Sequence, residues 1–189
     1  MDTRQGDLTV PNLITTIRII LAPIFIIYLL NRQVTSALIV FVVCSASDGV
    51  DGLLARFLNQ KSRLGTFLDP LADKLLLISA YVALSVTGFL PAWLTVAVIA
   101  RDVMILLGVL VIALNGMDFR IQPSVISKIN TCLQFITVIL VLSRECWVFP
   151  PTIYLAAYYL TAIFTVASGL HYMQFWFRVM GEGTGNHRE

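Results

Sequence analysis

Six apolar stretches, each long enough to cross a lipid bilayer, constrain this chain more than any other feature of its sequence. They run over residues 13–30, 36–57, 66–87, 91–114, 124–143 and 151–177. About 20 helical residues, at about 1.5 Å per residue, cover roughly 30 Å of hydrocarbon. Because lipid leaves no backbone polar group a partner outside the segment, such stretches form helices. The sequence therefore predicts an all-α integral membrane protein with six transmembrane helices.

Composition agrees with this class. Hydrophobic residues make up 58% of the chain and charged residues 13%, whereas soluble domains have about 45–50% and about 25%. A soluble enzyme, a disordered chain and a secreted disulfide scaffold are therefore excluded. The net charge of +2 is too small to indicate a nucleic-acid partner. Since the connections are short, we expect one six-helix domain over residues 1–180, followed by a disordered polar tail at 181–189.

Basic residues are distributed unequally between the two sides of the predicted bundle. The N-terminus, the 58–65 and 115–122 loops and the tail carry most of them: Arg4, Lys61, Arg63, Arg120, Arg178 and Arg188. The opposite loops carry only Arg32 and Arg144. Lys and Arg accumulate on the cytoplasmic side of membrane proteins. Both termini are therefore predicted to be cytoplasmic, and a cell inner membrane is the expected location.

Four aspartates gather near the cytoplasmic ends of the second and third stretches. Asp48 and Asp51 are three residues apart, and Asp69 and Asp73 are four apart, so each pair shares one helix face. The turn between the stretches brings these faces together, and four converging carboxylates repel each other unless a cation lies among them. Oxygen ligands of this kind suit one or two ions of Mg²⁺, Mn²⁺ or Ca²⁺, not zinc.

Small residues accompany the acids. Gly52 follows Asp51 directly, and Gly65 opens the third stretch. Small side chains allow a bulky ligand to approach the backbone. The alternative is close helix–helix packing, which is common for small residues in membranes.

The segment from Asp48 to Asp73 reads D-x-x-D-G-x-x-A-R-x(8)-G-x-x-x-D-x-x-x-D. It resembles the signature of the CDP-alcohol phosphotransferases, integral membrane enzymes of phospholipid head-group synthesis. All eight fixed positions are matched: Asp48, Asp51, Gly52, Ala55, Arg56, Gly65, Asp69 and Asp73. The opening PNLITTIR and the six-helix layout resemble the same family over most of the chain.

This resemblance implies a homodimer of six-helix protomers whose active site faces the cytoplasm. The enzyme would transfer a phosphatidyl group from CDP-diacylglycerol to an acceptor hydroxyl and release CMP. Asp48, Asp51, Asp69 and Asp73 would hold two Mg²⁺ or Mn²⁺ ions on the pyrophosphate, and Asp73 would also be the general base. The CDP moiety would be bordered by the remaining signature residues: Gly52, Ala55, Arg56 and Gly65.

Intramembrane cations are candidates for binding a phosphate-bearing acceptor, because such charges are costly in hydrocarbon unless they face a polar cavity. They are Arg18, Arg101 and Lys128. Each has an alternative role. Arg18 could pair with one of the aspartates, Arg101 could pair with its neighbour Asp102, and Lys128 could extend to the membrane surface.

The acceptor is indicated only by finer resemblances. ARDVMIL and ISKINTCLQ resemble the cardiolipin synthase branch of the family, which uses phosphatidylglycerol, whereas Arg63 before Gly65 resembles the phosphatidylglycerolphosphate synthase branch. We expect phosphatidylglycerol, with glycerol 3-phosphate as the alternative. A different class, a cation channel or transporter, would use the acidic cluster as an ion site. The acids lie at helix ends on one side, however, and not along a crossing path.

Overall fold

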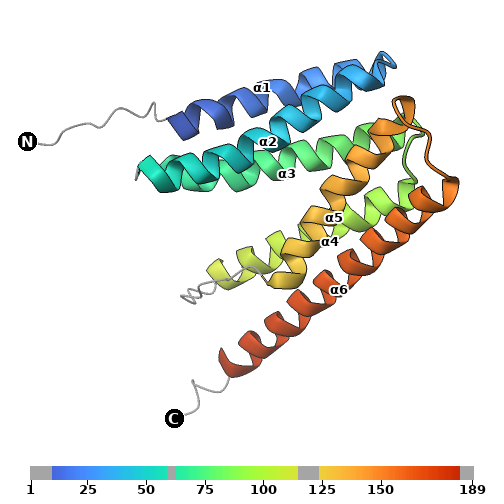
Figure 1. Cartoon of the computed structure of the whole chain (residues 1–189). Coiled ribbons are helices and arrows are strands. Elements are labelled where there is room, and N and C mark those ends of the chain that lie inside the picture. The colour runs from blue at the N-terminus through green and yellow to red at the C-terminus, as the bar shows by residue number, and fades with distance from the viewer. Residues whose placement is uncertain (1–9, 59–62, 115–123, 184–189) are drawn as a thin grey trace, which may run out of the picture. The chain divides into compact units, whose positions relative to one another are not determined.

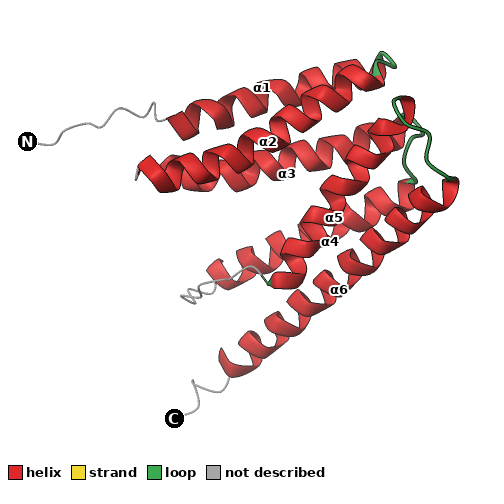
Figure 2. Ribbon diagram, viewed as in Figure 1, coloured by secondary structure: helices red, strands yellow, loops and turns green. Residues whose placement is uncertain are grey.

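The computed structural model describes residues 10–58, 63–114 and 124–183, and these residues lie in helices or short connections (Figures 1 and 2). Side chains are described for residues 20–46, 74–111 and 124–176. The α-helices are α1 (Val10–Leu30), α2 (Val34–Leu58), α3 (Arg63–Val86), α4 (Ala92–Leu114), α5 (Val125–Leu142) and α6 (Pro151–Gly183). A 3₁₀ turn, η1 (Ser143–Glu145), follows α5. The predicted all-α fold is confirmed for the described ranges.

The membrane character of the helices is clearest in the second half of the chain. Three stretches are long and apolar enough to cross a bilayer: Ala92–Val111, Val125–Glu145 and Pro151–Trp176. The apolar parts of α1, α2 and α3 whose side chains are described are shorter, at Ile20–Leu30, Val34–Ala46 and Lys74–Val86. Three spans therefore have structural support, and the full set of six remains a prediction. Of the predicted tail at 181–189, the first residues belong to α6, and residues 184–189 lie outside the described ranges.

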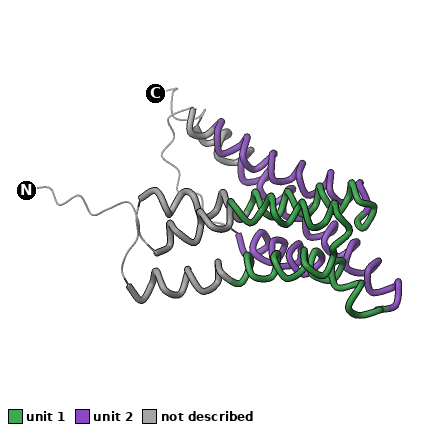
Figure 3. Tube along the Cα trace, turned by 90° about the horizontal axis from the view of Figure 1, so that it is seen from above, with its two compact units in different colours: residues 1–90, 138–149 green, residues 91–137, 150–189 purple. Residues whose placement is uncertain are grey.

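The chain divides into two compact units (Figure 3). One comprises residues 1–90 and 138–149, and the other comprises residues 91–137 and 150–189. The division falls inside α5, between Thr137 and Val138. This helix therefore contributes residues to both units.

In the first unit, α1 packs against both α2 and α3, and α2 contacts α3 and η1. The largest fully buried side chains here include Phe25, Phe41 and Tyr81. The rings of Phe25 and Phe41 lie 5.7 Å apart between centroids and join α1 to α2. Buried aromatic side chains thus lie on all three helices of this unit, two of which, α2 and α3, carry the aspartate signature.

Two turns of this unit end their helices in the same way. Arg32 after α1 and Gly88 after α3 have positive φ angles of 59° and 79°. The next amide in each turn bonds back to a carbonyl five residues earlier, Gln33 to Tyr28 and Phe89 to Leu84, as in a Schellman motif. The Arg32 guanidinium also lies 5.6 Å from the centre of the Phe89 ring, which joins the two turns at one end of the unit.

In the second unit, α4 and α6 lie against each other. The rings of Trp93 and Tyr159 lie 5.9 Å apart between centroids near one end of this helix pair. Near the other end, Trp176 lies directly against the backbone of Gly108. Ser124 directly precedes α5, and its hydroxyl accepts a hydrogen bond from the Ser127 amide at 3.2 Å. That is the contact of a serine N-cap.

Candidate functional site

The four signature aspartates lie on two helices of the same unit that contact each other. Asp48 and Asp51 lie ten and seven residues before the end of α2, and Asp69 and Asp73 lie six and ten residues after the start of α3. The two helices run antiparallel from a short connection at 59–62 (Figure 1). At about 1.5 Å per residue, the two pairs occupy matching levels, about 10–15 Å along the helices from that connection.

The other signature positions follow the same helices: Gly52, Ala55 and Arg56 lie on α2, and Gly65 lies on α3. Arg18 lies in the first half of α1, which packs against both. The side chains of residues 10–19 and 47–73 lie outside the described ones. Among the described side chains, no group of three or more His, Cys, Asp or Glu converges. The metal and CDP contacts therefore remain predictions, supported by helix positions alone.

Arg101 is the best-defined polar residue of the second unit. It is 4% exposed. Its Nη1 donates to the Asp102 carboxylate at 2.7 Å, and its Nη2 donates to the hydroxyls of Ser127 and Ser168 at 2.5 and 2.6 Å. Its Nε also donates to Ser168, at 3.2 Å. The guanidinium thereby joins α4 to α5 and α6.

These contacts supply most of the hydrogen bonds and the ion pair that a buried guanidinium requires. The Tyr172 ring centre lies 5.8 Å from the guanidinium carbon, close enough for a cation–π contact. A buried cation is tolerated when it is paired and hydrogen-bonded. The geometry therefore contains the pairing with Asp102 that the sequence left open for Arg101. Four of the five guanidinium N–H groups donate to oxygens of the described residues.

Lys128 lies in the first turn of α5, on a different face from Ser127, and its side chain is exposed. Its backbone amide donates to the Ser124 carbonyl at 3.2 Å. An exposed ammonium near a helix end agrees with the alternative in which Lys128 extends toward the membrane surface. The same position leaves it accessible to a ligand.

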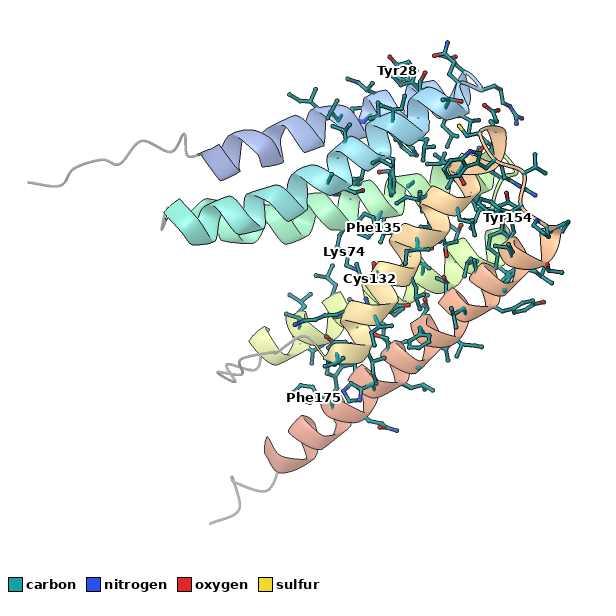
Figure 4. The ribbon with its side chains drawn as sticks, viewed as in Figure 1. Tyr28, Lys74, Cys132, Phe135, Tyr154 and Phe175 are labelled. Carbon is teal, nitrogen blue, oxygen red and sulfur yellow. The ribbon has the colours of Figure 1, made fainter. Side chains whose placement is uncertain are left out.

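A buried row of polar side chains continues from Arg101 between α5 and α6. We call it the polar seam, and its members are the half-buried Ser127 and the buried Asn130, Thr137, Thr161, Thr165 and Ser168. The Thr137 and Thr161 hydroxyls are 2.8 Å apart, and the Thr165 hydroxyl donates to Asn130 Oδ1 at 2.9 Å. Figure 4 labels Cys132 and Phe135 on the same part of α5, and Tyr154 and Phe175 toward the two ends of α6.

The seam was not predicted from the sequence, although a signal exists. Its positions on α5 are separated by three and seven residues, and those on α6 by four and three. These separations place each set along one helix face. A polar stripe inside an otherwise apolar stretch indicates a contact with another helix rather than with lipid.

Comparisons with known proteins agree with the signature. The family model described as CDP-alcohol phosphatidyltransferase matches residues 8–179. The cardiolipin synthase (CMP-forming) of Rattus norvegicus is 34% identical over 183 residues, which cover 88% of this chain and 61% of the relative. The CDP-diacylglycerol–glycerol-3-phosphate 3-phosphatidyltransferase of Bacillus subtilis is 35% identical over 181 residues, covering 86% of this chain and 92% of the relative.

A third relative, the cardiolipin synthase (CMP-forming) of Streptomyces coelicolor, is 37% identical over 115 residues, covering 58% of this chain and 54% of the relative. The chain thus spans about three fifths of the length of the rat relative. A relative named for cardiolipin synthesis and one named for transfer to glycerol 3-phosphate match this chain at similar identity.

Proposed function

The chain belongs to the CDP-alcohol phosphatidyltransferase family, and from this membership we propose that it transfers a phosphatidyl group from CDP-diacylglycerol to an acceptor hydroxyl. The observation that carries the proposal is the family match over residues 8–179 together with the complete aspartate signature on two packed helices. A water-soluble CDP group and a membrane-bound diacylglycerol meet only where polar helix ends reach the lipid surface. The signature positions near the ends of α2 and α3 suit that requirement.

The donor set fits a divalent metal site. Asp48, Asp51, Asp69 and Asp73 offer only carboxylate oxygens at matching helix levels, and Mg²⁺ or Mn²⁺ accepts such ligands. When bound, the ions stabilise negative charge on the attacking and leaving oxygens. The four carboxylates would hold a pair of such ions, and this is part of the proposal.

The reaction proceeds by attack of the acceptor oxygen on the phosphorus that bears the diacylglycerol. A new phosphorus–oxygen bond forms, the pyrophosphate bond to CMP breaks, and CMP leaves with the bridging oxygen. Asp73 accepts the proton of the acceptor hydroxyl, which a carboxylate can do when it reaches that hydroxyl. The CDP moiety lies along Gly52, Ala55, Arg56 and Gly65, where small residues leave room and Arg56 offers a fork of donors for phosphate.

We further propose that all six helices cross the membrane within one domain over residues 1–180. The N- and C-termini and the α2–α3 connection face the cytoplasm, because the basic residues gather on that side. The working assembly is a homodimer, and an inner membrane is its location.

Phosphatidylglycerol is the proposed acceptor, which makes the product cardiolipin. Support comes from the R-D-V and S-K-x-N-T-x-x-Q patterns of α4 and α5 and from the cardiolipin synthases among the relatives. Glycerol 3-phosphate is the alternative, supported by Arg63 and by the Bacillus relative, nearly all of which the chain covers. Arg18 and Lys128 are proposed to contact the acceptor phosphate, and Arg101 contributes its charge from within the second unit.

An acceptor screen tests the proposal. The purified full-length chain in detergent is given CDP-diacylglycerol and Mg²⁺ or Mn²⁺, with either phosphatidylglycerol or glycerol 3-phosphate. We expect CMP release and cardiolipin with phosphatidylglycerol, and little CMP release with glycerol 3-phosphate. The reverse pattern would replace the acceptor and leave the transferase assignment in place. If no CMP is released with either acceptor, the transferase assignment is contradicted.

The rival class, a cation channel or transporter, predicts a different binding behaviour. An enzyme of the proposed kind binds CDP in the presence of the divalent metal and loses this binding when the metal is chelated. An ion-conducting protein has no reason to bind a nucleotide. Calorimetric titration of the purified chain with CDP, with and without chelator, separates the two classes.

A further inference from the structure

The connection between α5 and α6 presents two adjacent apolar side chains at its surface. Trp147 is 70% exposed and Val148 is 95% exposed. Residues 138–149 belong to the first unit, where η1 contacts α2. Single exposed apolar residues are common on proteins, but a tryptophan at the end of a membrane-spanning stretch is typical of the boundary between lipid and water. The level of this pair relative to the membrane therefore decides what covers it.

The lengths of the neighbouring spans limit how far the connection extends from the membrane. The span before it, Val125–Glu145, has 21 residues, and the span after it begins at Pro151. At about 1.5 Å per residue, the first span covers about 30 Å, the thickness of the hydrocarbon. Residues 146–150 leave this surface and return to it, so at about 3.5 Å per residue they rise no more than about 9 Å. The head-group layer is about 5–8 Å deep on each side, and the apolar pair therefore lies at its level.

Two arginines lie at the same end of the first unit. Arg144 is exposed on η1, and Arg32 is exposed in the turn between α1 and α2. The two segments meet at the start of α2, where Thr35 Oγ1 lies 4.0 Å from Cys146 Sγ. Thr35 is three residues after Arg32, and Cys146 directly precedes Trp147. The apolar pair and both arginines therefore belong to one surface.

The charge of this surface suits a phosphate. The Arg32 guanidinium lies over the Phe89 ring at 5.6 Å, and its Nη1 donates to the Thr87 carbonyl at 3.4 Å. These contacts position the side chain without neutralising it, and an arginine offers a planar fork of donors to phosphate oxygens. Glu145 is the one acidic residue in segments 31–33, 87–91 and 143–150, which also hold the two arginines. Positive charge therefore exceeds negative charge here.

We propose that the surface formed by Arg32, Arg144, Trp147 and Val148 binds phospholipid head groups of the leaflet in which α5 ends. The arginines contact the phosphates, and the two apolar side chains lie at the boundary with the acyl chains. Anionic lipids are preferred, because each basic residue near a membrane surface adds attraction for negative charge. The proposal depends on α5 and α6 crossing the membrane and is independent of the transfer reaction. The competing occupants are water and a second copy of the chain.

A nitroxide label measures what covers the surface. The full chain in lipid nanodiscs carries Val148→Cys, with Cys44 and Cys132 replaced by alanine and Cys146 by serine. We expect the ratio of oxygen access to access of a water-soluble nickel complex to exceed that of a free nitroxide in buffer. A label at Leu106→Cys, on an exposed position of an α4 span, gives the value for hydrocarbon.

Two results of this measurement would overturn the proposal. A ratio equal to that of the free nitroxide would mean that water covers the surface. Low access to both reagents would mean that protein covers it, and dipolar broadening between labels would then identify a second copy of the chain.

A second measurement tests the arginines. A fluorescent label on the same Val148→Cys chain is quenched by spin-labelled phosphatidylserine or phosphatidylcholine, neither of which is a substrate of the proposed reaction. We expect stronger quenching by phosphatidylserine, and Arg32→Gln with Arg144→Gln should lower this preference by about five-fold or more. Because Arg32 also joins two turns, Arg144→Gln alone is the second variant if the double variant fails to fold, with a smaller fall expected.

The matched control is Glu145→Gln, which removes a negative charge from the same surface and should raise the preference for phosphatidylserine. Equal quenching by the two lipids, or a preference that the arginine variants leave unchanged, would overturn the proposal. Both readouts report lipid contact at residue 148, so they stand whether or not the chain transfers a phosphatidyl group.

Discussion

Arg101 illustrates how far single residues could be predicted from the sequence. A charge in an apolar stretch identified it as a residue that needs partners, and Asp102 was one of them. Its other partners, Ser127 and Ser168, come from two different helices. Serine is ordinary in membrane helices, so nothing in either residue alone predicts that it will meet an arginine. The missing information was the register between helices, not the chemistry of the residue.

The aspartates are the opposite case. The apolar stretches predicted the helices, and the spacing predicted that Asp48 with Asp51, and Asp69 with Asp73, share a helix face; these residues do lie on α2 and α3. The side-chain contacts of these residues remain predictions.

At the residue scale we predict that Asp73→Asn keeps the fold and loses at least about 100-fold in transfer rate. The amide cannot take the proton of the acceptor hydroxyl, and general-base catalysis contributes about 10²–10⁴-fold. CMP release from CDP-diacylglycerol measures the loss. The exposed Glu145 of η1 provides the matched control, since Glu145→Gln removes one carboxylate outside the signature. Full activity in a folded Asp73→Asn preparation would disprove the catalytic role.

The helices themselves were well predicted. Each of the six apolar stretches coincides with one α-helix, because prolines and short polar turns mark their ends clearly. α6 extends beyond its predicted end, to Gly183, and no proline interrupts the residues that follow the apolar stretch. What the stretches did not predict was the pairing of the helices. Contact of α4 with α6 depends on a small residue meeting a large one across the interface.

At the scale of the elements, Gly108 leaves no room for a side chain between α4 and α6. A Cβ added there would overlap the Trp176 ring, whereas a Cβ at Gly169 would have Arg101 Cγ as its nearest neighbour at 3.8 Å, an ordinary contact. We therefore predict that Gly108→Ala lowers the melting midpoint by several degrees, because overpacking costs about 1–3 kcal/mol.

The control for this prediction is Gly169→Ala, which should leave the midpoint unchanged or raise it slightly, since alanine favours helix by about 1 kcal/mol over glycine. Light-scattering or fluorescence-detected melting in the same detergent compares the two. Equal midpoints for both variants would mean that Trp176 does not hold the packing of α4 on α6.

For the whole molecule, the predicted orientation can be tested with a cysteine that the chain already has. Cys146 is exposed after η1 and belongs to the connection predicted to lie outside the cytoplasm. With Cys44 and Cys132 replaced by alanine, we expect a membrane-impermeant thiol reagent added to intact cells to label it. A Ser62→Cys variant that also lacks Cys146 should be labelled only after the membrane is opened. The reverse pattern would invert the topology.

The two compact units were not predicted from the sequence, which favoured one domain because no linker separates the helices. A division inside α5 has no linker to detect. The continuous helix α5 supplies residues to both units, and its buried residues change from polar to apolar at the division. The part up to Thr137 carries the polar seam, and Val138, Val141 and Leu142 beyond it are buried apolar residues.

The polar seam has a consequence for how cohesion in the second unit responds to temperature. Where hydrocarbon surrounds the helices, bringing α5 and α6 together releases little ordered water, so the heat-capacity change that accompanies apolar burial from water is small. Hydroxyl, amide and guanidinium bonds supply the attraction instead. Such an interface does not lose its driving force on cooling in the way that a water-formed core does. Over the temperatures at which a cell grows, the strength of this interface is set mainly by enthalpy. The fluidity of the lipid then becomes the property that temperature changes most.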